Sequence, residues 1–388
     1  MELRISERAK NYPPSGIRKM FDLATQYPDA IKLTVGEPNF DTPEYIKKAA
    51  KEAIDAGRTH YAPNSGIDEL RQSVANKYKS YWEGYTKDHV IITVGAMEGL
   101  MLSMMAILNP GDEILVPDPC FPNYYGQASI VGAKAVPVPT YEKNEYRIQA
   151  EDIEKAITPH TKAILLNSPC NPTGAVLTRE DVLAIAELVK KHDLWVLSDE
   201  PYDSIVYDGV QPFSIAEVPE VRDQVMVFNS FSKAYAMTGW RLGYACGPQP
   251  VISQMLKMHQ FAIMCAPTVS QMAAVEAMRS CDEAIQEMRD EYNMRRRLMV
   301  DRLNKMGLTC FEPRGAFYVF PSIRITGMTS AEFCEALLHS KRVAVVPGDA
   351  FGACGEGHVR ISYSYSMEHL TEALHRIEAF LKERGIHA

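Results

Sequence analysis

One short segment of the chain combines an amine, two hydroxyls and a guanidinium. Lys233 follows an apolar run, with Ser230 and Ser232 just before it and Arg241 eight residues after it in a glycine-flanked turn. A lysine amine can form a Schiff base with a carbonyl compound, and hydroxyls with a guanidinium can hold a phosphate dianion. A lysine after an apolar strand is more often a solvated loop residue, but these neighbours indicate a site for a phosphorylated carbonyl compound.

Pyridoxal 5′-phosphate (PLP) is the cofactor whose needs these groups meet. Residues 229–244, NSFSKAYAMTGWRLGY, closely resemble the Schiff-base segment of class I aminotransferases of PLP fold type I. Further motifs follow the family's order: VGEPNF at 35–40, HYAP at 60–63, NPTG at 171–174, SDEPY at 198–202 and VRIS at 359–362. One such motif alone would be weak evidence, but their order is specific. The resemblance covers nearly the whole chain and implies an aspartate- or aromatic-type aminotransferase that holds PLP on Lys233.

Asp199 ends an apolar strand, where a carboxylate could also be a helix cap or a surface residue. The resemblance places Asp199 at the pyridine nitrogen of PLP, where it keeps the ring protonated so that the ring draws electrons from the substrate α-carbon. It also places the Asn171 amide and the Tyr202 hydroxyl at the phenolic oxygen of the cofactor. Pro201 stands where relatives carry Ile or Val, which is expected to shift the Tyr202 ring slightly. Glu200 is expected to point elsewhere and to be structural.

Gly95, Ala96 and Met97 lie where an apolar strand turns into a long apolar helix. Backbone N–H groups at such a turn can bind a phosphate, although a simple tight turn would look the same. Relatives often carry Ser, Thr or Lys at position 97, and the resemblance links a lysine there to acidic substrates, so Met97 argues against aspartate as the donor. Residues 119–124 match the family pattern that stacks Phe121 on the pyridine ring and puts Tyr124 nearby.

Arg360 lies within an apolar strand pattern, where burial is costly unless the guanidinium meets an anion. A planar guanidinium can hold a carboxylate through two parallel hydrogen bonds. The resemblance assigns Arg360 to the substrate α-carboxylate, with help from Gly36 and Asn171. It also implies that Tyr61 reaches the cofactor phosphate of a partner subunit, and therefore that the protein is a homodimer with shared active sites.

The resemblance implies that Lys233 removes the substrate α-proton and returns it to the cofactor, first as general base and then as general acid. An L-amino acid would give its amino group to a 2-oxo acid such as 2-oxoglutarate in a ping-pong cycle. Met97, the neutral surroundings of Phe121 and the lack of an obvious second arginine favour aromatic or other neutral, hydrophobic donors. Relatives that act on aspartate, alanine, methionine or acylated diaminopimelate differ in pocket loops, including residues 15–18.

Two alternatives from other classes stay open. PLP-dependent carbon–sulfur β-lyases use a similar cofactor site, and the products distinguish them: pyruvate, ammonia and a thiol instead of an oxo acid alone. Some transcription regulators carry an aminotransferase-like domain, but they need an added DNA-binding domain. We expect none here, because there is little chain before Val35 and no basic helix.

The composition fits an enzyme-sized globular protein. The chain has 388 residues, 46% hydrophobic and 23% charged, and a net charge of -8, which provides no basic field for nucleic acid. We see no apolar secretory signal and no run long enough to span a membrane. The eight cysteines form no C-x-x-C pair, and none of the ten histidines has a metal-binding spacing. We therefore expect a cytoplasmic protein with reduced thiols and no metal site.

Short apolar runs alternate with helical patterns over most of the chain, which predicts an α/β fold with a mostly parallel sheet flanked by helices. The expected strands are residues 90–94, 113–116, 163–166, 194–198 and 225–229. Thr178 is expected to cap a helix over residues 180–192, whose apolar face would consist of Leu183, Ile185, Ala186, Leu188 and Val189.

After about residue 278 the pattern changes. A charged helix over residues 282–306 leads to hairpin-like strands at 316–321 and 360–365. We therefore expect a large PLP-binding domain over residues 35–278. Residues 1–34 and 279–388 would together form a smaller α+β domain.

Overall fold

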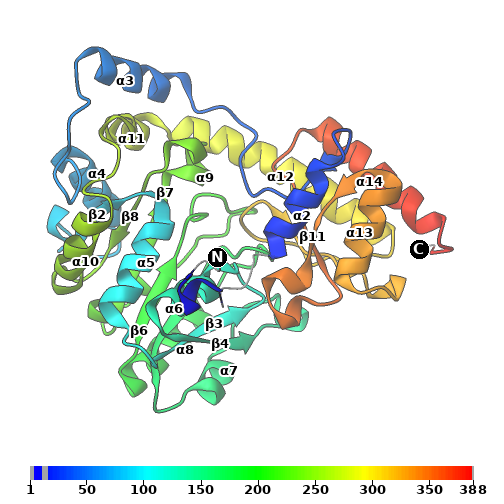
Figure 1. Ribbon diagram of the computed structural model, residues 1–388, viewed down its shortest axis with the longest axis horizontal. Helices are drawn as coiled ribbons and strands as arrows, with labels where there is room; N and C mark the ends of the chain where they lie inside the picture. Colours follow the sequence, from blue (N-terminus) through cyan, green and yellow to red (C-terminus); the bar gives the residue numbers. More distant parts are fainter. Residues whose placement is uncertain (1–3, 11–15, 387–388) are drawn as a thin grey trace.

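The computed structural model describes residues 4–10 and 16–386, and its largest element is a seven-stranded sheet (Figure 1). Its order is β2-β8-β7-β6-β5-β3-β4, and only β8 runs antiparallel to its neighbours. The strands are β2 (Val90–Thr93), β3 (Glu113–Asp118), β4 (Lys134–Pro139), β5 (Thr161–Asn167), β6 (Trp195–Asp199), β7 (Val225–Ser230) and β8 (Gly243–Cys246). The five predicted strands are confirmed, whereas β4 and β8 were not predicted.

The burial of each strand explains which ones the sequence reveals. The inner strands β3 and β7 are buried along their whole length, so their sequences are nearly continuous apolar runs. In the edge strand β4 only Val138 is fully buried, and the strand contains Pro137 and Pro139, which weakens its strand signal. Edge position therefore accounts for the failure to predict β4.

Helices cover both faces of this sheet. One face packs against α4 (Asp68–Tyr78), α8 (Arg179–His192) and α11 (Thr268–Ser280). The other packs against α5 (Gly95–Ile107), α6 (Asn123–Val131) and α10 (Gln249–Ala262). Beside them lie α3 (Glu44–Asp55), which packs on α11, α7 (Ala150–Ala156) and the one-turn helix α9 (Phe231–Ala234).

Helix α8 begins as the sequence predicts. The Thr178 hydroxyl accepts a hydrogen bond from the Asp181 backbone N–H, and the Asp181 carboxylate accepts one from the Thr178 N–H, which together form a capping box. Four of the five predicted face residues are buried, but Leu183 is 41% exposed, so that assignment was wrong. Val182 takes the buried place, since it lies three residues before Ile185 on the same side.

The rest of the chain forms the smaller α+β domain, beside the sheet in Figure 1. A three-stranded antiparallel sheet has the order β11-β12-β9, and β1 pairs in parallel with β10. The predicted strand at 316–321 is only two residues long, because Ala316 and Phe317 form a turn in which Ala316 has a φ of +57°. The elements are α2 (Gly16–Thr25), β1 (Ile31–Lys32), α12 (Asp282–Lys305), β9 (Tyr318–Val319), α13 (Ser330–Lys341), β10 (Val343–Ala344), β11 (Val346–Pro347), β12 (Val359–Ser362) and α14 (Met367–Lys382).

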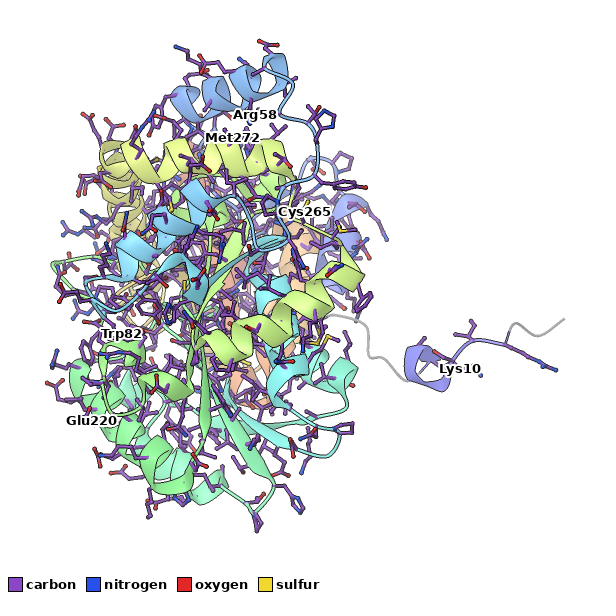
Figure 2. The ribbon with its side chains drawn as sticks, turned by 90° about the vertical axis from the view of Figure 1, so that its left-hand side faces the viewer. Lys10, Arg58, Trp82, Glu220, Cys265 and Met272 are labelled. Atoms are coloured by element: carbon purple, nitrogen blue, oxygen red, sulfur yellow. The ribbon has the colours of Figure 1, made fainter. Side chains whose placement is uncertain are left out.

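Short 3₁₀ helices occupy connecting turns at Lys87–His89, Glu142–Asn144, Ile215–Glu217, Arg222–Gln224, Thr238–Trp240, Arg324–Thr326, Gly348–Phe351 and Ala353–Gly355. Figure 2 shows the first helix, α1 (Glu7–Lys10), standing away from the body of the molecule with Lys10 on it.

None of the helices in the described ranges is long and apolar enough to cross a membrane. All eight cysteines are unpaired, as predicted.

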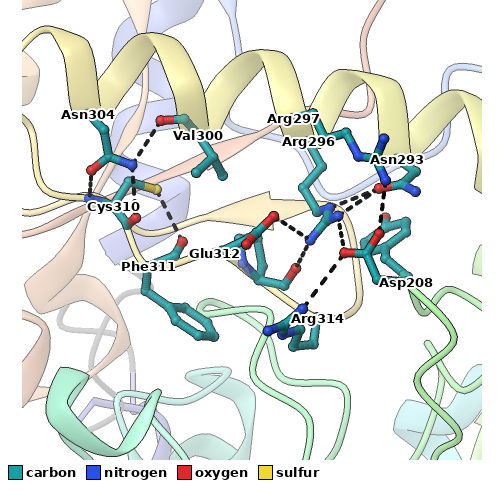
Figure 3. Close-up of polar contacts among 12 residues, drawn as sticks. Asp208, Asn293, Arg296, Arg297, Val300, Asn304, Cys310, Phe311, Glu312 and Arg314 are labelled. Carbon is teal, nitrogen blue, oxygen red and sulfur yellow. Dashed lines mark hydrogen bonds and ion pairs between the residues drawn. The ribbon is translucent and has the colours of Figure 1, made fainter.

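A buried arginine joins the loop after β6 to the smaller domain (Figure 3). Arg296 of α12 has no exposed surface and donates to the Asp208 carboxylate at 2.5 Å and to the Pro313 carbonyl at 2.9 Å. Glu312 lies 3.2 Å from the same guanidinium. The neighbouring Arg297 also donates to Asp208, but from the surface. Arg296 therefore connects three chain segments: the loop after β6, α12 and the turn before β9.

We predict that Arg296→Met lowers the free energy of unfolding by about 2 kcal/mol, because it removes the hydrogen bonds of a fully buried guanidinium and leaves the buried Pro313 carbonyl without its donor. Arg297→Met is the matched control: its side chain is 66% exposed, so its loss should cost less than about 1 kcal/mol. Urea denaturation of both variants measures the difference. Equal stability of the two variants would contradict the assignment of Arg296 as the joining residue.

Candidate active site

A pocket of 540 Å³ opens at the carboxyl ends of β5, β6 and β7. Ligands of open α/β sheets bind at such an edge. Every residue predicted from the sequence to act in the site lines this pocket except Tyr61: Gly36, Gly95, Ala96, Met97, Phe121, Asn171, Asp199, Tyr202, Ser230, Ser232, Lys233, Arg241 and Arg360. The fold thus brings together residues that are more than 300 positions apart in the chain.

Lys233 lies in α9, immediately after β7. The Ser230 hydroxyl caps this one-turn helix by accepting a hydrogen bond from the Ser232 N–H at 3.1 Å. The Lys233 amine donates to the Gly36 carbonyl at 2.5 Å. Burial first, and then the nearby Arg360 charge, lowers the pKa of Lys233 to about 8. A substantial fraction of this amine is therefore neutral and nucleophilic near neutral pH.

Asp199 is a buried carboxylate with only half of its hydrogen-bonding capacity used. The Tyr124 hydroxyl donates to Oδ2 at 2.7 Å, whereas Oδ1 has no partner in the described part of the chain. Burial raises the pKa of Asp199 to about 6, against the opposing effects of the Tyr124 hydrogen bond and the Lys233 charge. An orphaned buried acceptor of this kind suits a cationic N–H donor.

The turn from β2 into α5 leaves room for an anion. Gly95 has a φ of +71°, and a Cβ there would lie 2.9 Å from Arg241 Nη2, so a larger residue would displace the guanidinium. The Glu98 carboxylate accepts a hydrogen bond from the Val94 N–H at 2.6 Å and holds the turn. The helix N-terminus, Arg241 and Ser232 line the same pocket, where N–H groups and a guanidinium could together bind a phosphate.

Arg360 is buried in β12 without an acidic partner among the described residues. It donates to the Asn171 side-chain carbonyl at 3.0 Å and to the Thr34 carbonyl, while its Nε has no partner within residues 4–10 and 16–386. The rings of Tyr318 and Phe351 lie 4.7 and 4.8 Å from the guanidinium. This partly satisfied cation in the pocket suits the carboxylate of a ligand.

Two polar residues of the site were missed at the sequence level. Asn167 donates to the Asp199 carbonyl at 2.9 Å and accepts from the Asn171 N–H at 2.9 Å, so it ties two site segments together. The Tyr318 hydroxyl lies 2.8 Å from that of Tyr202 and packs against Gly36, where any Cβ would collide with it. Asn167 could have been found, because it ends a buried strand just as Asp199 does.

Three other predictions have different outcomes. Tyr61 is 85% exposed and does not line this chain's own pocket. Phe121 lines it with its ring edge-on to Tyr124, 5.7 Å between centroids. Glu200 points away, as predicted, and accepts hydrogen bonds from Ser198 and Ser214. Of the predicted pocket loop 15–18, residue 15 lies outside the described residues and Arg18 lines the pocket.

Comparison with known proteins decides the family. Residues 28–377 match the model for aminotransferase class I and II. The chain belongs to this aminotransferase family. It is 46% identical to aromatic-amino-acid aminotransferase 2 of Thermococcus litoralis and 46% identical to an aspartate aminotransferase of Pyrococcus abyssi, each over 99% of this chain and 100% of the relative. The crystal structure of an aromatic aminotransferase from Pyrococcus horikoshii OT3 has a TM-score of 0.91 at 44% identity, covering 95% of this chain and 100% of that one.

The enzyme is a PLP-dependent aminotransferase of fold type I. The polar groups of the pocket also fit PLP independently of the comparisons. Asp199 Oδ1 is an unpartnered acceptor for a ring N–H, Gly95 leaves space beside Arg241 for a phosphate, and the Lys233 amine is poised for a carbonyl group. No group of His, Cys, Asp and Glu within residues 4–10 and 16–386 could hold a metal ion.

We predict that Tyr124→Phe raises the pKa of the Asp199 carboxyl in the cofactor-free protein by roughly one unit, as measured by NMR titration of the carboxyl carbon. The lost hydrogen bond stabilises the charged carboxylate, so its removal raises the pKa of Asp199. A bond to a charged group contributes about 1.5 kcal/mol, close to one pKa unit. Tyr125→Phe, which changes a neighbour facing Cys120, is the control. An unchanged Asp199 pKa in Tyr124→Phe would contradict this role.

Proposed function

We propose that this aminotransferase takes aromatic or other neutral, hydrophobic L-amino acids as donors and 2-oxoglutarate as acceptor. The observation that carries the proposal is the apolar part of the pocket lining, formed by Phe21, Met97, Leu100 and Phe121. Such a surface stabilises an apolar side chain by removing it from water. The relative from Thermococcus litoralis, named for aromatic amino acids, supports this choice. The aspartate aminotransferase of Pyrococcus abyssi supports an acidic compound as one of the two substrates.

We assign the cofactor contacts by chemistry. Asp199 would hold the ring nitrogen, Asn171 and Tyr202 the phenolic oxygen, and Phe121 one face of the ring. The phosphate would be held by Gly95, Ala96, Met97, Ser230, Ser232 and Arg241. Support comes from the orphaned Asp199 oxygen and from the cations and N–H groups that line the same pocket.

In the proposed mechanism PLP, when bound, draws electrons from the substrate α-carbon. Arg360, with Gly36 and Asn171, holds the substrate α-carboxylate and fixes which bond of the α-carbon faces Lys233. The Lys233 amine removes the proton from the α-carbon as a general base and later returns it as a general acid. Its pKa of about 8 suits both tasks, because the proton is neither too strongly nor too weakly held.

We predict that Lys233→Ala lowers kcat by at least roughly 100-fold, the lower bound for loss of a general acid–base group. Asp199 and Arg241 remain in that variant to hold the cofactor. Lys155→Ala, an exposed lysine on α7, is the control and should keep wild-type turnover. The measurement is oxo-acid formation from phenylalanine and 2-oxoglutarate. Turnover within a few-fold of wild type in Lys233→Ala would refute the assignment.

We also propose that the enzyme is a cytoplasmic homodimer with shared active sites. Unpaired cysteines support a reducing compartment. An exposed apolar group supports an interface: Phe261, Ile263 and Met264 at the end of α10, together with Tyr61. In this dimer Tyr61 would contact the partner's cofactor phosphate. We propose domain boundaries of 35–278 for the large domain, and of 1–34 with 279–388 for the small one. Support comes from the hydrophobic clusters: the two on the faces of the large sheet lie almost entirely within 35–278, and a third lies mostly in the small domain.

A mixing experiment tests the shared site. We predict that Tyr61→Ala and Lys233→Ala dimers are each inactive or weakly active, because one lacks the partner contact and the other the base. A hybrid of the two contains one site with both native residues, so about half of wild-type activity per hybrid dimer should return. The measurement is activity after the two variants are dissociated and reassociated together, with each variant treated alone as the control. No gain on mixing would contradict the shared site.

A further inference from the structure

The pocket contains more positive charge than the proposed cofactor and α-carboxylate contacts use. Four cationic side chains line it in the described part of the chain: Arg18, Lys233, Arg241 and Arg360. Lys233 supplies the amine, Arg241 faces the phosphate position and Arg360 takes the α-carboxylate. Arg18 takes no part in these cofactor and α-carboxylate contacts, although it lines the same pocket and could bind a further anionic group.

Arg18 is held only weakly where it stands. Among the residues that the structure describes, it pairs with Asp22 of the same helix at 3.4 Å, and both side chains are largely exposed, 75% and 60%. Exposed pairs at this spacing contribute little, because water screens them. The guanidinium can therefore exchange Asp22 for another carboxylate without a large penalty.

Helix α2 presents Arg18 and Phe21 together to the pocket. Residues three apart lie on one side of a helix, so a cation and an aromatic ring share that side. Its neighbour Lys19 faces elsewhere, 3.6 Å from Glu335 of α13. Gly16 sets the start of the helix against Ala350, where a Cβ would come within 3.0 Å of the alanine side chain. The helix therefore rests on the smaller domain and turns a mixed apolar and cationic side toward the substrate.

An aminotransferase must admit two substrates in turn at one site, here an apolar donor and an acidic acceptor. The apolar lining cannot pair with the distal carboxylate of an acidic compound, and an unpaired carboxylate is costly to desolvate. We propose that Arg18 binds the side-chain carboxylate of the dicarboxylic substrate, while Phe21 contacts aromatic side chains. This inference rests on the proposed function and adds the residue that lets one pocket serve both substrate classes.

The test compares Arg18→Gln with Lys19→Gln in the holoenzyme. Both remove one exposed positive charge from the same helix, but only Arg18 lines the pocket. Half-reactions with L-glutamate and with L-phenylalanine, each without an oxo acid, give kcat/KM for the two classes. We expect Arg18→Gln to lower kcat/KM for glutamate roughly 10- to 100-fold, the range for a lost charge-assisted hydrogen bond. The value for phenylalanine should stay within about twofold, Lys19→Gln should match wild type for both, and Arg18→Lys should be intermediate.

Equal losses for both amino acids in Arg18→Gln, or no loss for glutamate, would overturn the proposal. So would a wild-type enzyme that does not react with glutamate. Failure of the proposed function is distinct: the wild-type enzyme would then fail to convert phenylalanine, while the glutamate comparison between wild type and Arg18→Gln still decides the role of Arg18.

Discussion

The structure depends on holding three ionisable side chains in one pocket without giving them a full set of partners: Asp199 and Arg360 are buried and Lys233 is half-buried. Burial alone disfavours each charge, which is why the pKa of Asp199 rises and that of Lys233 falls. The rest of the fold compensates for this cost through fixed contacts such as the Tyr124 and Asn171 hydrogen bonds. The hydrogen-bonding groups that stay unpaired, Asp199 Oδ1 and Arg360 Nε, are available to a ligand.

The two domains divide this task. The sheet delivers Asn167, Asp199 and Ser230 at the ends of adjacent buried strands, so their spacing is fixed by the strand ladder. The smaller domain delivers Arg360 on β12 and Tyr318 on β9, and α2 adds Arg18 at the pocket lining. Arg296 fixes the loop that follows β6 against α12 (Figure 3). Because the pocket is made from both domains, their relative placement sets the distance between Lys233 and Arg360.

Much of this could be predicted from the sequence, since buried strands have unambiguous apolar patterns and the site motifs are contiguous. The side-chain types in a motif also indicate their chemical roles, as the lysine amine and the arginine guanidinium of residues 229–244 do. Contacts between distant segments could not be predicted. Tyr318 lies in a two-residue strand without a pattern, and its contact with Tyr202 arises only from folding. Leu183 was misassigned because an apolar pattern does not distinguish two neighbouring apolar positions at the border of a helix's buried face.

The visible absorbance of the purified holoenzyme, recorded as single amino acids are added without any oxo acid, shows whether the enzyme takes amino groups from aromatic donors. We predict that phenylalanine or tyrosine replaces the band of bound PLP with the shorter-wavelength band of pyridoxamine phosphate. Subsequent addition of 2-oxoglutarate should restore the first band. If the protein acquires no visible band with PLP, or if no amino acid converts that band, the proposed reaction of PLP with aromatic donors is wrong.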